Sequence, residues 1–355
     1  MGLLTDFIDS TTKAIGFDLP GWADLVIASV IGAVLMFTVV LSIGGVFTFL
    51  FRRIFARMGQ RPGPNRVGPQ GIFQFLADGA KLISKEDVRP AKADKLAWTA
   101  ALYVAVVFTV MAWAPIPWSG EVVFSNAGTG ILLILAMGAI APLAEILAGW
   151  GSNNKYSLYG GVRAAALDVS YEIPMVFAVA AILLITGSLA TNDIVNAQHG
   201  HLWFFIPQII GFVIFFITAL AKAGLVPTDL AESESELVAG FTTEYGAMRF
   251  GMFFVVLFSN VFFVSAMSVM LYLGGWHAPF SGSLPMLDTL LGPFTAPLWF
   301  LAKSLLVSFV VFWVWITMPR VRVDQYLSVA WKVMLPLSIV NFVLTAVLIK
   351  AGVLG

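Results

Sequence analysis

The stretch GAMRFGMFFVVLFSNVFFVSAMSVMLYLG, from Gly246 to Gly274, has one charged side chain, Arg249, in an otherwise mostly apolar run. A run of about 18 or more apolar residues can cross the hydrocarbon core of a bilayer as a helix. Directly before it lies the acidic segment, DLAESESELVAGFTTEY from Asp229 to Tyr245, which holds five carboxylates. The sequence therefore predicts a transmembrane helix that begins beside acidic groups. Charge next to hydrocarbon must pair, take up a proton or sit in water.

The rest of the chain repeats this pattern of long apolar runs. Hydrophobic residues make up 59% of the sequence and charged residues 11%, which is typical of an integral membrane protein and excludes a soluble domain. Eight apolar runs predict transmembrane helices, near 24–51, 96–118, 129–150, 165–187, 203–221, 246–274, 296–318 and 327–350. The predicted fold is all-α, a polytopic bundle of eight transmembrane helices that forms a single membrane domain over residues 1–355.

The distribution of Lys and Arg predicts how the bundle is oriented. All but three of the twenty basic residues lie in the loops after predicted helices 1, 3, 5 and 7, or at the adjoining helix ends. Because basic loops stay on the cytoplasmic side, these four loops are expected to face the cytoplasm. Both termini are then expected on the opposite side.

Several function classes are excluded by residue usage. The chain has no Cys and three His, so we expect no disulfide, no cysteine-ligated iron–sulfur cluster and no metal site within it. A formal net charge of zero gives no basis for nucleic-acid binding. Any redox centre is therefore expected in a partner or a substrate.

The first basic loop, from Arg52 to Lys95, contains a predicted amphipathic helix over residues 71–85. Its polar and apolar side chains fall on two separate stripes: Gln74, Asp78, Lys81 and Lys85 on one, and Ile72, Phe73, Leu76, Ala80 and Ile83 on the other. Such a helix lies in the membrane interface, where it either walls an opening between lipid and protein or anchors the loop. Before it, the Pro- and Gly-rich turn GPNRVGP, with Arg61 and Arg66, either presents positive charge to a docked partner or is a solvated loop.

Within the acidic segment, Asp229, Glu232 and Glu236 have the spacing i, i+3, i+7, which predicts a helix with all three on one face and Glu234 elsewhere. A structural alternative is that Asp229 and Glu232 only form a capping box at a helix start. That alternative does not explain Glu236 or Glu244. Like charges this close raise one another's pKa, which favours proton uptake near neutral pH.

Four further charged groups lie inside predicted helices. Asp168 and Glu172 are one helical turn apart, and Arg163 is expected to pair with Asp168, which leaves Glu172 as a possible proton relay. Glu145 has no neighbour of opposite sign in the sequence. Lys303 is expected either to meet a carboxylate or water from another helix or to extend toward the interface.

Seven motifs, taken together and in order, resemble those of one known family. They are RPGPNRVGP (61–69), ADGAKL (77–82), KE (85–86), GW with SNNKY (149–156), SYE (170–172), ESELVAGFTTEY (234–245) and PRVRVDQ (319–325). These motifs resemble the cytoplasmic loops of the H subunits of respiratory complex I, the proton-translocating NADH:quinone oxidoreductase. The resemblance runs from about residue 45 to 345.

The resemblance implies a membrane subunit that forms the membrane side of the quinone chamber and couples quinone reduction to proton translocation. It implies that this chain binds no cofactor, that quinone is the substrate, and that iron–sulfur clusters and FMN reside in partner subunits. The implied partners are the peripheral quinone-site subunits and the small membrane subunits that lead to antiporter-like subunits. The implied location is the bacterial inner membrane or an equivalent energy-coupling membrane.

The resemblance also implies roles for particular residues. The proton-coupling carboxylates would be Asp229, Glu232, Glu234, Glu236 and Glu244, continued by Glu172. Asp168 and Glu145 are added to this path from their place inside predicted helices, since the family is usually neutral or of opposite charge at these positions. The quinone chamber and the docking surface would use Arg61, Arg66, Phe73, Leu76, Asp78, Lys81, Arg249, Arg320 and Arg322, the last three as counter-charges.

Several positions depart from the family pattern. The chain has Phe51 and Lys222 where the family usually has Glu, Leu225 and Trp315 where it has Arg, Leu257-Phe258 where it has Glu-Tyr, and Leu167 where it has Gln. These departures favour an alternative function, a structural membrane anchor of a related redox or hydrogenase complex without quinone chemistry of its own. A self-sufficient transporter is disfavoured because no internal repeat is visible.

Overall fold

The computed structural model describes residues 21–200, 202–278 and 294–352, without the side chains of 21–24, 234 and 235. These ranges form helices joined by loops, and no β-strand occurs within them. Seven helical spans are long and apolar enough to cross a membrane: α2 (Gly21–Met58), α4 (Lys95–Trp113), α5 (Gly130–Gly151), α6 (Lys155–Thr186), α10 (Ala247–Tyr272), α12 (Thr295–Thr317) and Val323–Lys350. An eighth apolar helix, α8 (Ile209–Lys222), is shorter. The predicted all-α polytopic membrane fold is therefore confirmed.

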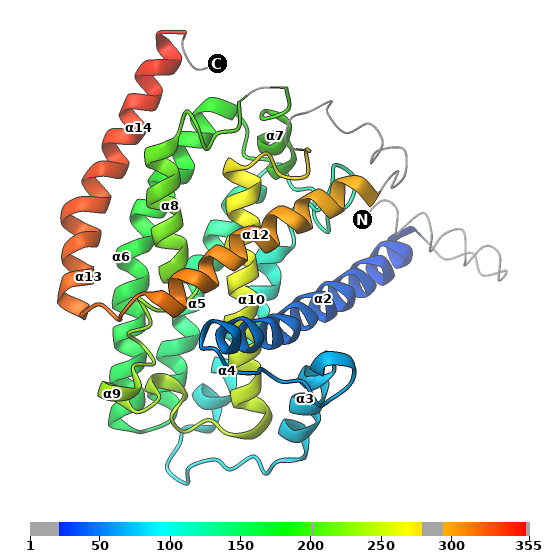
Figure 1. Ribbon diagram of the computed structural model, residues 1–355, viewed down its shortest axis with the longest axis vertical. Coiled ribbons are helices and arrows are strands. Elements are labelled where there is room, and N and C mark those ends of the chain that lie inside the picture. The colour runs from blue at the N-terminus through cyan, green and yellow to red at the C-terminus, as the bar shows by residue number, and fades with distance from the viewer. Residues whose placement is uncertain (1–20, 201, 279–293, 353–355) are drawn as a thin grey trace, which may run out of the picture.

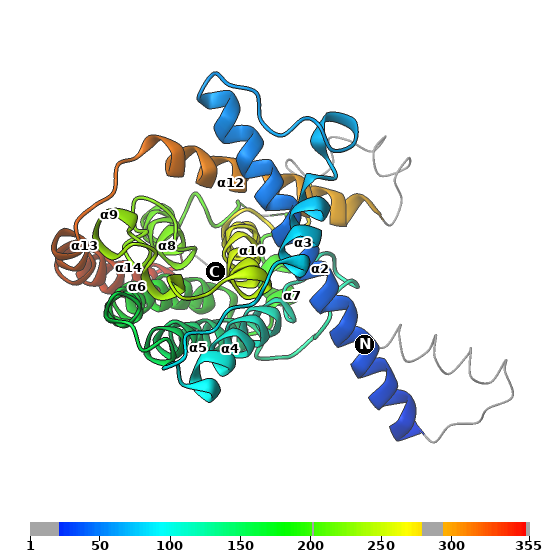
Figure 2. The same ribbon diagram turned by 90° about the horizontal axis from the view of Figure 1, so that it is seen from below.

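Helix α10 lies at the centre of the bundle (Figures 1 and 2). It contacts α2, α4, α8 and α12, and 72% of its apolar window is buried, against 17% for α2. Helices α4, α5 and α6 pack side by side in chain order, and α14 (Leu335–Lys350) packs on the outside of α6. The apolar window of α2 is more hydrophobic than that of α10, so position in the bundle, rather than apolarity alone, decides which helix its neighbours enclose.

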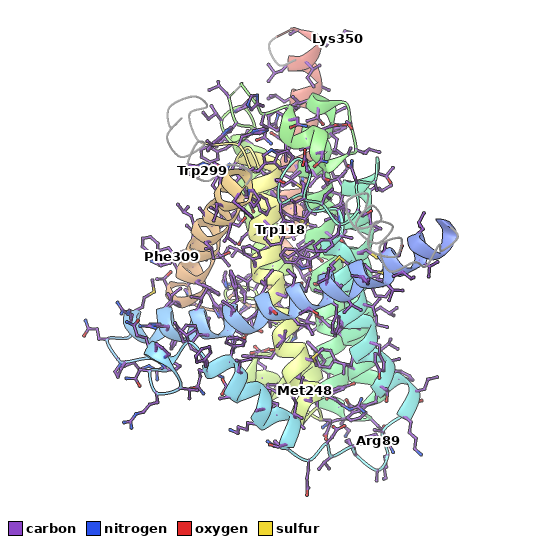
Figure 3. All side chains as sticks on the ribbon, turned by 90° about the vertical axis from the view of Figure 1, so that its right-hand side faces the viewer. Arg89, Trp118, Met248, Trp299, Phe309 and Lys350 are labelled. Carbon is purple, nitrogen blue, oxygen red and sulfur yellow. The ribbon has the colours of Figure 1, made fainter. Side chains whose placement is uncertain are left out.

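The two ends of the bundle differ in what they carry. Figure 3 places Arg89 at one end of the molecule and Lys350 at the other. The short helices α3 (Gln74–Ser84) and α9 (Glu234–Leu237) lie at the Arg89 end, whereas α7 (Thr191–Asn196) lies toward the opposite end (Figure 1). The predicted amphipathic helix and the acidic segment therefore lie at the same end of the bundle.

Four helix ends differ from the sequence-based expectation by five or more residues, and each has a local cause. Helix α2 ends at Met58 rather than near 51, because Arg52, Arg53 and Arg57 end the apolar run without ending the helix. Helix α6 begins at Lys155 rather than near 165, because the Asn154 side chain caps it by accepting a hydrogen bond from the Tyr156 amide, 3.0 Å away. Helix α8 begins at Ile209 rather than 203, since Pro207 disfavours helical backbone in the residue before it. Helix α4 ends at Trp113 rather than 118, just before Pro115 and Pro117.

The last predicted helix, 327–350, is longer and is not uniform. It consists of α13 (Val323–Val329), a wide π-helical turn (Ala330–Met334) and α14. Pro336 lies just beyond the π turn and has no amide hydrogen to donate, and wide turns of this kind are where a helix absorbs such a defect.

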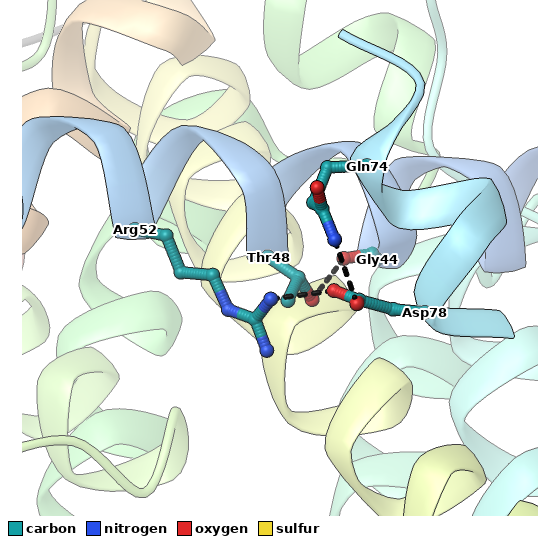
Figure 4. A network of polar contacts seen from close by, with 5 residues as sticks. All are labelled: Gly44, Thr48, Arg52, Gln74 and Asp78. Carbon is teal, nitrogen blue, oxygen red and sulfur yellow. Dashed lines mark hydrogen bonds and ion pairs between the residues drawn. The ribbon is translucent and has the colours of Figure 1, made fainter. Parts of the chain in front are cut away.

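Helix α3 is anchored to α2 by charge rather than by apolar packing alone. Asp78 of α3 pairs with Arg52 of α2 and accepts a hydrogen bond from Gln74, 3.0 Å away (Figure 4). Phe73 and Leu76, by contrast, are about half exposed, at 49% and 57%. The polar side of α3 is thus fixed to α2, which leaves apolar side chains facing outward, as an interfacial helix requires.

Candidate functional site

The acidic segment is not the helix that its spacing predicted. Residues 229–233 are non-helical, and the rest of the segment forms only the four-residue α9, whose N-cap is Ser233, and a short 3-10 helix over Gly240–Thr242. The predicted common face of Asp229, Glu232 and Glu236 and the capping box from Asp229 are both wrong. Tertiary contacts explain this, because Asp229 pairs with Arg320 at 2.9 Å and the Val321 amide donates to the Pro227 carbonyl at 3.1 Å. The segment is therefore held against the loop that joins α12 to α13.

The acids of the segment face different surroundings. Asp229 and Glu232 line a buried cavity. Glu236 pairs with Arg163 and is about half exposed, while Glu244 accepts a hydrogen bond from the Asn154 side chain at 2.5 Å. Glu234 begins α9, and its side chain lies outside the described residues.

Arg163 does not pair with Asp168, so that expectation is wrong. Its guanidinium reaches Glu236 and the Leu230 carbonyl instead. Five residues of α-helix turn by roughly 140°, which places Arg163 and Asp168 on different faces of α6. Asp168 instead accepts a hydrogen bond from Tyr171, three residues along the same face.

The cavity has a volume of about 120 Å³ and lies between α4, α5, α6, α8, α10 and the acidic segment. We call it the acidic cavity. Its charged and phenolic lining residues come from five parts of the chain, namely α5, α6, α8, the acidic segment and α13: Glu145, Asp168, Tyr171, Lys222, Asp229, Glu232 and Tyr326. Since a buried water needs roughly 10–15 Å³ of such space and polar partners, the acidic cavity has room for several.

Two carboxylates of the membrane-spanning helices differ in their partners. Glu172 of α6 pairs with Lys222 of α8 at 3.4 Å, and both side chains are largely buried, at 16% and 11% exposed. Glu145 of α5 has no ion pair or hydrogen bond to any described side chain, although it faces the same cavity as Asp168. Glu172 therefore has a partner that the sequence did not indicate, whereas Glu145 has none among the described side chains, as the sequence suggested.

Glu232 has an altered proton affinity. Burial, followed by the neighbouring Asp229 carboxylate, raises the pKa of Glu232 from its usual value to about 7, and the positive charge of Arg320 opposes this rise. A carboxyl with this pKa exchanges protons near neutral pH. Glu232 lies in the loop between α8 and α9 and lines the acidic cavity together with Glu145 and Asp168 of the membrane-spanning helices.

The residues expected at the quinone chamber and docking surface lie mostly at the surface. Arg61 lies over the Phe55 ring at 5.6 Å, and Arg66 and Lys81 are exposed. Of the three arginines expected as counter-charges, Arg320 contacts the acidic segment. The other two pair elsewhere: Arg249 contacts Asp87 at 2.7 Å and covers Trp98, and Arg322 contacts Asp324 at 2.8 Å.

Three positions that depart from the family pattern contact one another. Phe51 of α2 stacks on Trp315 of α12 with ring centroids 4.0 Å apart, and Phe258 of α10 lies 5.4 Å from Phe51 and 5.8 Å from Trp315. Phe312 adds a fourth ring, 5.5 Å from Phe51. We call these four rings the aromatic cluster. Aromatic side chains thus meet where the family pattern would bring together polar or charged ones.

Lys303 in α12 pairs with no carboxylate among the described residues. Its ammonium donates to the carbonyls of Leu273 and His277, at 2.7 and 2.8 Å, and lies 4.8 Å from the Trp203 ring centroid. These carbonyls follow the end of α10, where unsatisfied acceptors and the negative end of the helix dipole favour a cation.

Two contributors to the site were not singled out from the sequence: Asn154, which donates to Glu244, and Tyr171, which donates to Asp168. Lys222 was noted only as a departure from the family pattern, and its pairing with Glu172 was not predicted. Asn before a periodic run is an ordinary N-cap signal and could have been recognised. The Lys222–Glu172 pair joins residues fifty positions apart, so no local pattern indicates it.

Comparisons with known proteins identify relatives along nearly the whole chain. The profile of the NADH dehydrogenase family matches residues 31–346. The H subunit of NADH-quinone oxidoreductase from Brevibacillus brevis is 43% identical over 321 residues, covering 90% of this chain and 93% of the relative. The H subunits from Dehalococcoides mccartyi strain CBDB1 (43% identical, covering 85% of this chain and 81% of the relative) and Rhodospirillum centenum (41%, 93% and 95%) are similar. With its all-helical membrane fold and buried acids, the chain belongs to the NADH dehydrogenase family that includes these H subunits.

Proposed function

We propose that this chain is the membrane subunit of a respiratory NADH:quinone oxidoreductase that forms the membrane side of the quinone chamber and couples quinone reduction to proton translocation. The observation that carries the proposal is the acidic cavity, where Glu145, Asp168 and Glu232 converge from three separate parts of the chain. A structural role alone would not require several carboxylates beside a water-sized space, because burying them is costly.

In this proposal, Glu232 takes up a proton near neutral pH in the loop region, and Asp168 and Glu145 lead the charge into the membrane. Asp229 is fixed by Arg320 and sets the local potential beside Glu232. Glu172 contributes charge from α6. Glu236 and Glu244 add charge from the same segment, oriented by Arg163 of α6 and by its N-cap residue. Glu234 keeps its expected role as a coupling carboxylate.

We assign quinone entry to the side of the bundle formed by α2 and α3. The exposed Phe73 and Leu76 give an apolar wall for a lipid-soluble substrate, and the Arg52–Asp78 pair fixes the orientation of that wall. The basic side chains Arg61, Arg66 and Lys81 lie in the same loop region and would contact a peripheral partner.

The proposed setting follows from the family and the membrane fold. The iron–sulfur clusters and FMN belong to peripheral partner subunits, and small membrane subunits connect this chain to antiporter-like subunits. The proposed location is a bacterial inner membrane or an equivalent energy-coupling membrane, with the acidic segment on the cytoplasmic side and both termini on the other. The whole chain then acts as one membrane domain.

The test uses the intact complex in sealed vesicles, with donor oxidation, short-chain quinone reduction and proton uptake measured on the same preparation. We expect Glu232→Gln to reduce quinone-linked proton uptake about a hundredfold or more, the lower range for losing a proton-transfer group. Glu121→Gln is the matched control, because Glu121 is an exposed carboxylate in the loop between α4 and α5. Normal assembly with uptake unchanged in Glu232→Gln contradicts the proposed role of the acidic cavity.

A second candidate function, a structural anchor without quinone chemistry, is favoured by the aromatic cluster alone. Phe51, Phe258 and Trp315 fill with packed rings a site where charge would be expected. The same vesicles separate the two functions. A complex that oxidises its donor with an artificial acceptor but neither reduces quinone nor takes up protons is an anchor.

A further inference from the structure

Lys222 is the one cation among the residues that line the acidic cavity in the described part of the chain. It ends α8, and its ammonium crosses to α6, where it lies 3.4 Å from the Glu172 carboxylate. With both side chains largely buried, each charge is the main compensation for the other. Removing either Lys222 or Glu172 would therefore leave the other charge buried in a low-dielectric setting without its partner.

The neighbouring helix provides space for this ammonium. A Cβ atom added at Gly138 of α5 would lie 2.1 Å from the Lys222 Nζ and 2.8 Å from its Cε. No real Cβ approaches another atom so closely, so any other residue at 138 displaces the lysine. The same added atom would be 3.7 Å from the Glu172 carboxylate, which stays clear. Gly138 thus forms a notch that seats the ammonium beside Glu172.

The groups around Lys222 are otherwise acidic or phenolic. Asp168 and Tyr171 line the cavity from α6, Glu145 from α5 and Tyr326 from α13, and Asp229 and Glu232 line it from the acidic segment. Asp229 already has Arg320 as its partner. Glu172 also borders a shallow groove on α6 whose other lining residues are Val169, Ile173, Val176 and Phe177. An unpaired Glu172 would therefore face mostly apolar surroundings on that side.

We propose that Lys222, seated in the Gly138 notch, is a positioning residue that keeps Glu172 ionised, so that protons passing through the acidic cavity use Glu232, Asp168 and Glu145 instead of Glu172. This inference rests on the proposed function. It makes Glu172 a fixed charge and leaves Glu232, Asp168 and Glu145 as the groups that carry protons. The physical reason is that an ammonium within about 4 Å favours the ionised carboxylate, whereas a buried carboxyl without a cation takes up a proton.

The test measures protonation directly, by infrared spectroscopy of the protonated-carboxyl band in the intact complex as pH is varied. In the wild type, Glu172→Gln should remove no protonated-carboxyl signal at neutral pH. Lys222→Met should add one signal, which the double variant Lys222→Met/Glu172→Gln should lack. We expect this new signal to titrate about 1–3 pH units above that of a paired carboxylate.

Two further variants separate positioning from simple charge loss. Gly138→Ala keeps the lysine but displaces it, so it should produce the same new signal as Lys222→Met. Its control is Ala139→Ser, which adds one heavy atom at the next, exposed position of α5. The control for Lys222→Met is Lys350→Met, an exposed lysine at the end of α14. Neither control should alter the band.

The proposal is overturned if Glu172→Gln removes a protonated-carboxyl signal from the wild type, or if Lys222→Met leaves the band unchanged. Turnover gives a second readout. The double variant, which leaves neither charge alone, should restore the pH profile of proton uptake that Lys222→Met shifts to higher pH. Because the infrared signal does not depend on turnover, failure of the proposed coupling function would leave the protonation result readable on its own.

Discussion

The acidic cavity and the aromatic cluster lie on different faces of the same central helix. Leu257 of α10 lines the cavity, and the next residue, Phe258, belongs to the cluster. Both regions contain departures from the family pattern, yet they differ in kind: the cavity gains the cation Lys222, whereas the cluster replaces polar groups with rings. The comparison indicates two ways in which a buried region accommodates a change of charge. In the cavity the new cation pairs with a carboxylate, and in the cluster the contacting side chains are all uncharged.

The largest effect is expected where the aromatic cluster is broken. Phe258 is fully buried, so Phe258→Ala should lower the free energy of unfolding by about 3–5 kcal/mol, from lost burial and the cavity left behind. Thermal unfolding of the detergent-purified complex measures this. Phe309→Ala, at a ring that is 43% exposed, is the control and should change stability by less than about 1 kcal/mol. Equal effects would mean that the cluster is no more important to stability than the surface.

The acidic cavity is tested by pH. Because the pKa of Glu232 is raised to about 7 in the folded protein, this carboxyl binds a proton more tightly there than in the unfolded chain. Its stabilising contribution is therefore present below about pH 4.5 and is lost as pH rises through about 7. The thermal midpoint should fall between about pH 5 and pH 8 by more in the wild type than in Glu232→Gln. Parallel pH profiles would remove Glu232 from the titrating groups.

A smaller effect is expected at the boundary between the acidic segment and α6. Asn154 caps α6 through the Tyr156 amide and also donates to Glu244. Asn154→Ala should cost about 1 kcal/mol, the usual loss for an N-cap, and should free Glu244. Asn154→Ser keeps a capping oxygen but its side chain is too short to reach Glu244, so it should retain most of the stability yet alter proton uptake. Hydrogen exchange at the first turn of α6 reports the cap.

The smallest effect is expected for the Arg163–Glu236 pair. Its side chains are 24% and 52% exposed, so solvent screens their attraction. Glu236→Gln should change stability by at most about 1 kcal/mol, and the difference should shrink as salt is raised. The buried Lys222–Glu172 pair should show no such salt dependence. A salt-insensitive Arg163–Glu236 pair would mean that a partner covers it in the complex.

The apolar helices were predictable from the sequence because burial in lipid requires long uninterrupted runs, and those runs locate α2, α10 and α12 to within a few residues at most ends. The first turns of α6 were missed because KYSLYGGVRAAALDV is too polar for a hydropathy window, although Asn154 signals the start. A hydropathy window also does not detect a single Pro or capping residue, so helix ends set by such residues are predicted less accurately.

The membership of the acidic cavity was partly predictable, but its geometry was not. Intramembrane carboxylates such as Glu145 and Asp168 stand out because they are costly in hydrocarbon. Their partners come from distant parts of the chain: Arg320 reaches Asp229 and Lys222 reaches Glu172. In the acidic segment these tertiary contacts outweighed the helical spacing of the acids, because the preference of a short, charged stretch for helix is weak.

Lys303 of α12, whose ammonium is bound at the carboxyl end of α10, has a consequence for motion. Lys303 fastens α12 to the carbonyls of Leu273 and His277, and Trp315 packs α12 against α10 twelve residues further along, about 18 Å away. Two attachments of different chemistry on one helix pair prevent α12 from pivoting about either one. We therefore expect helices α10 and α12 to move as one rigid body, and a displacement of this body to carry the following loop, with Arg320 and its partner Asp229, in the same step.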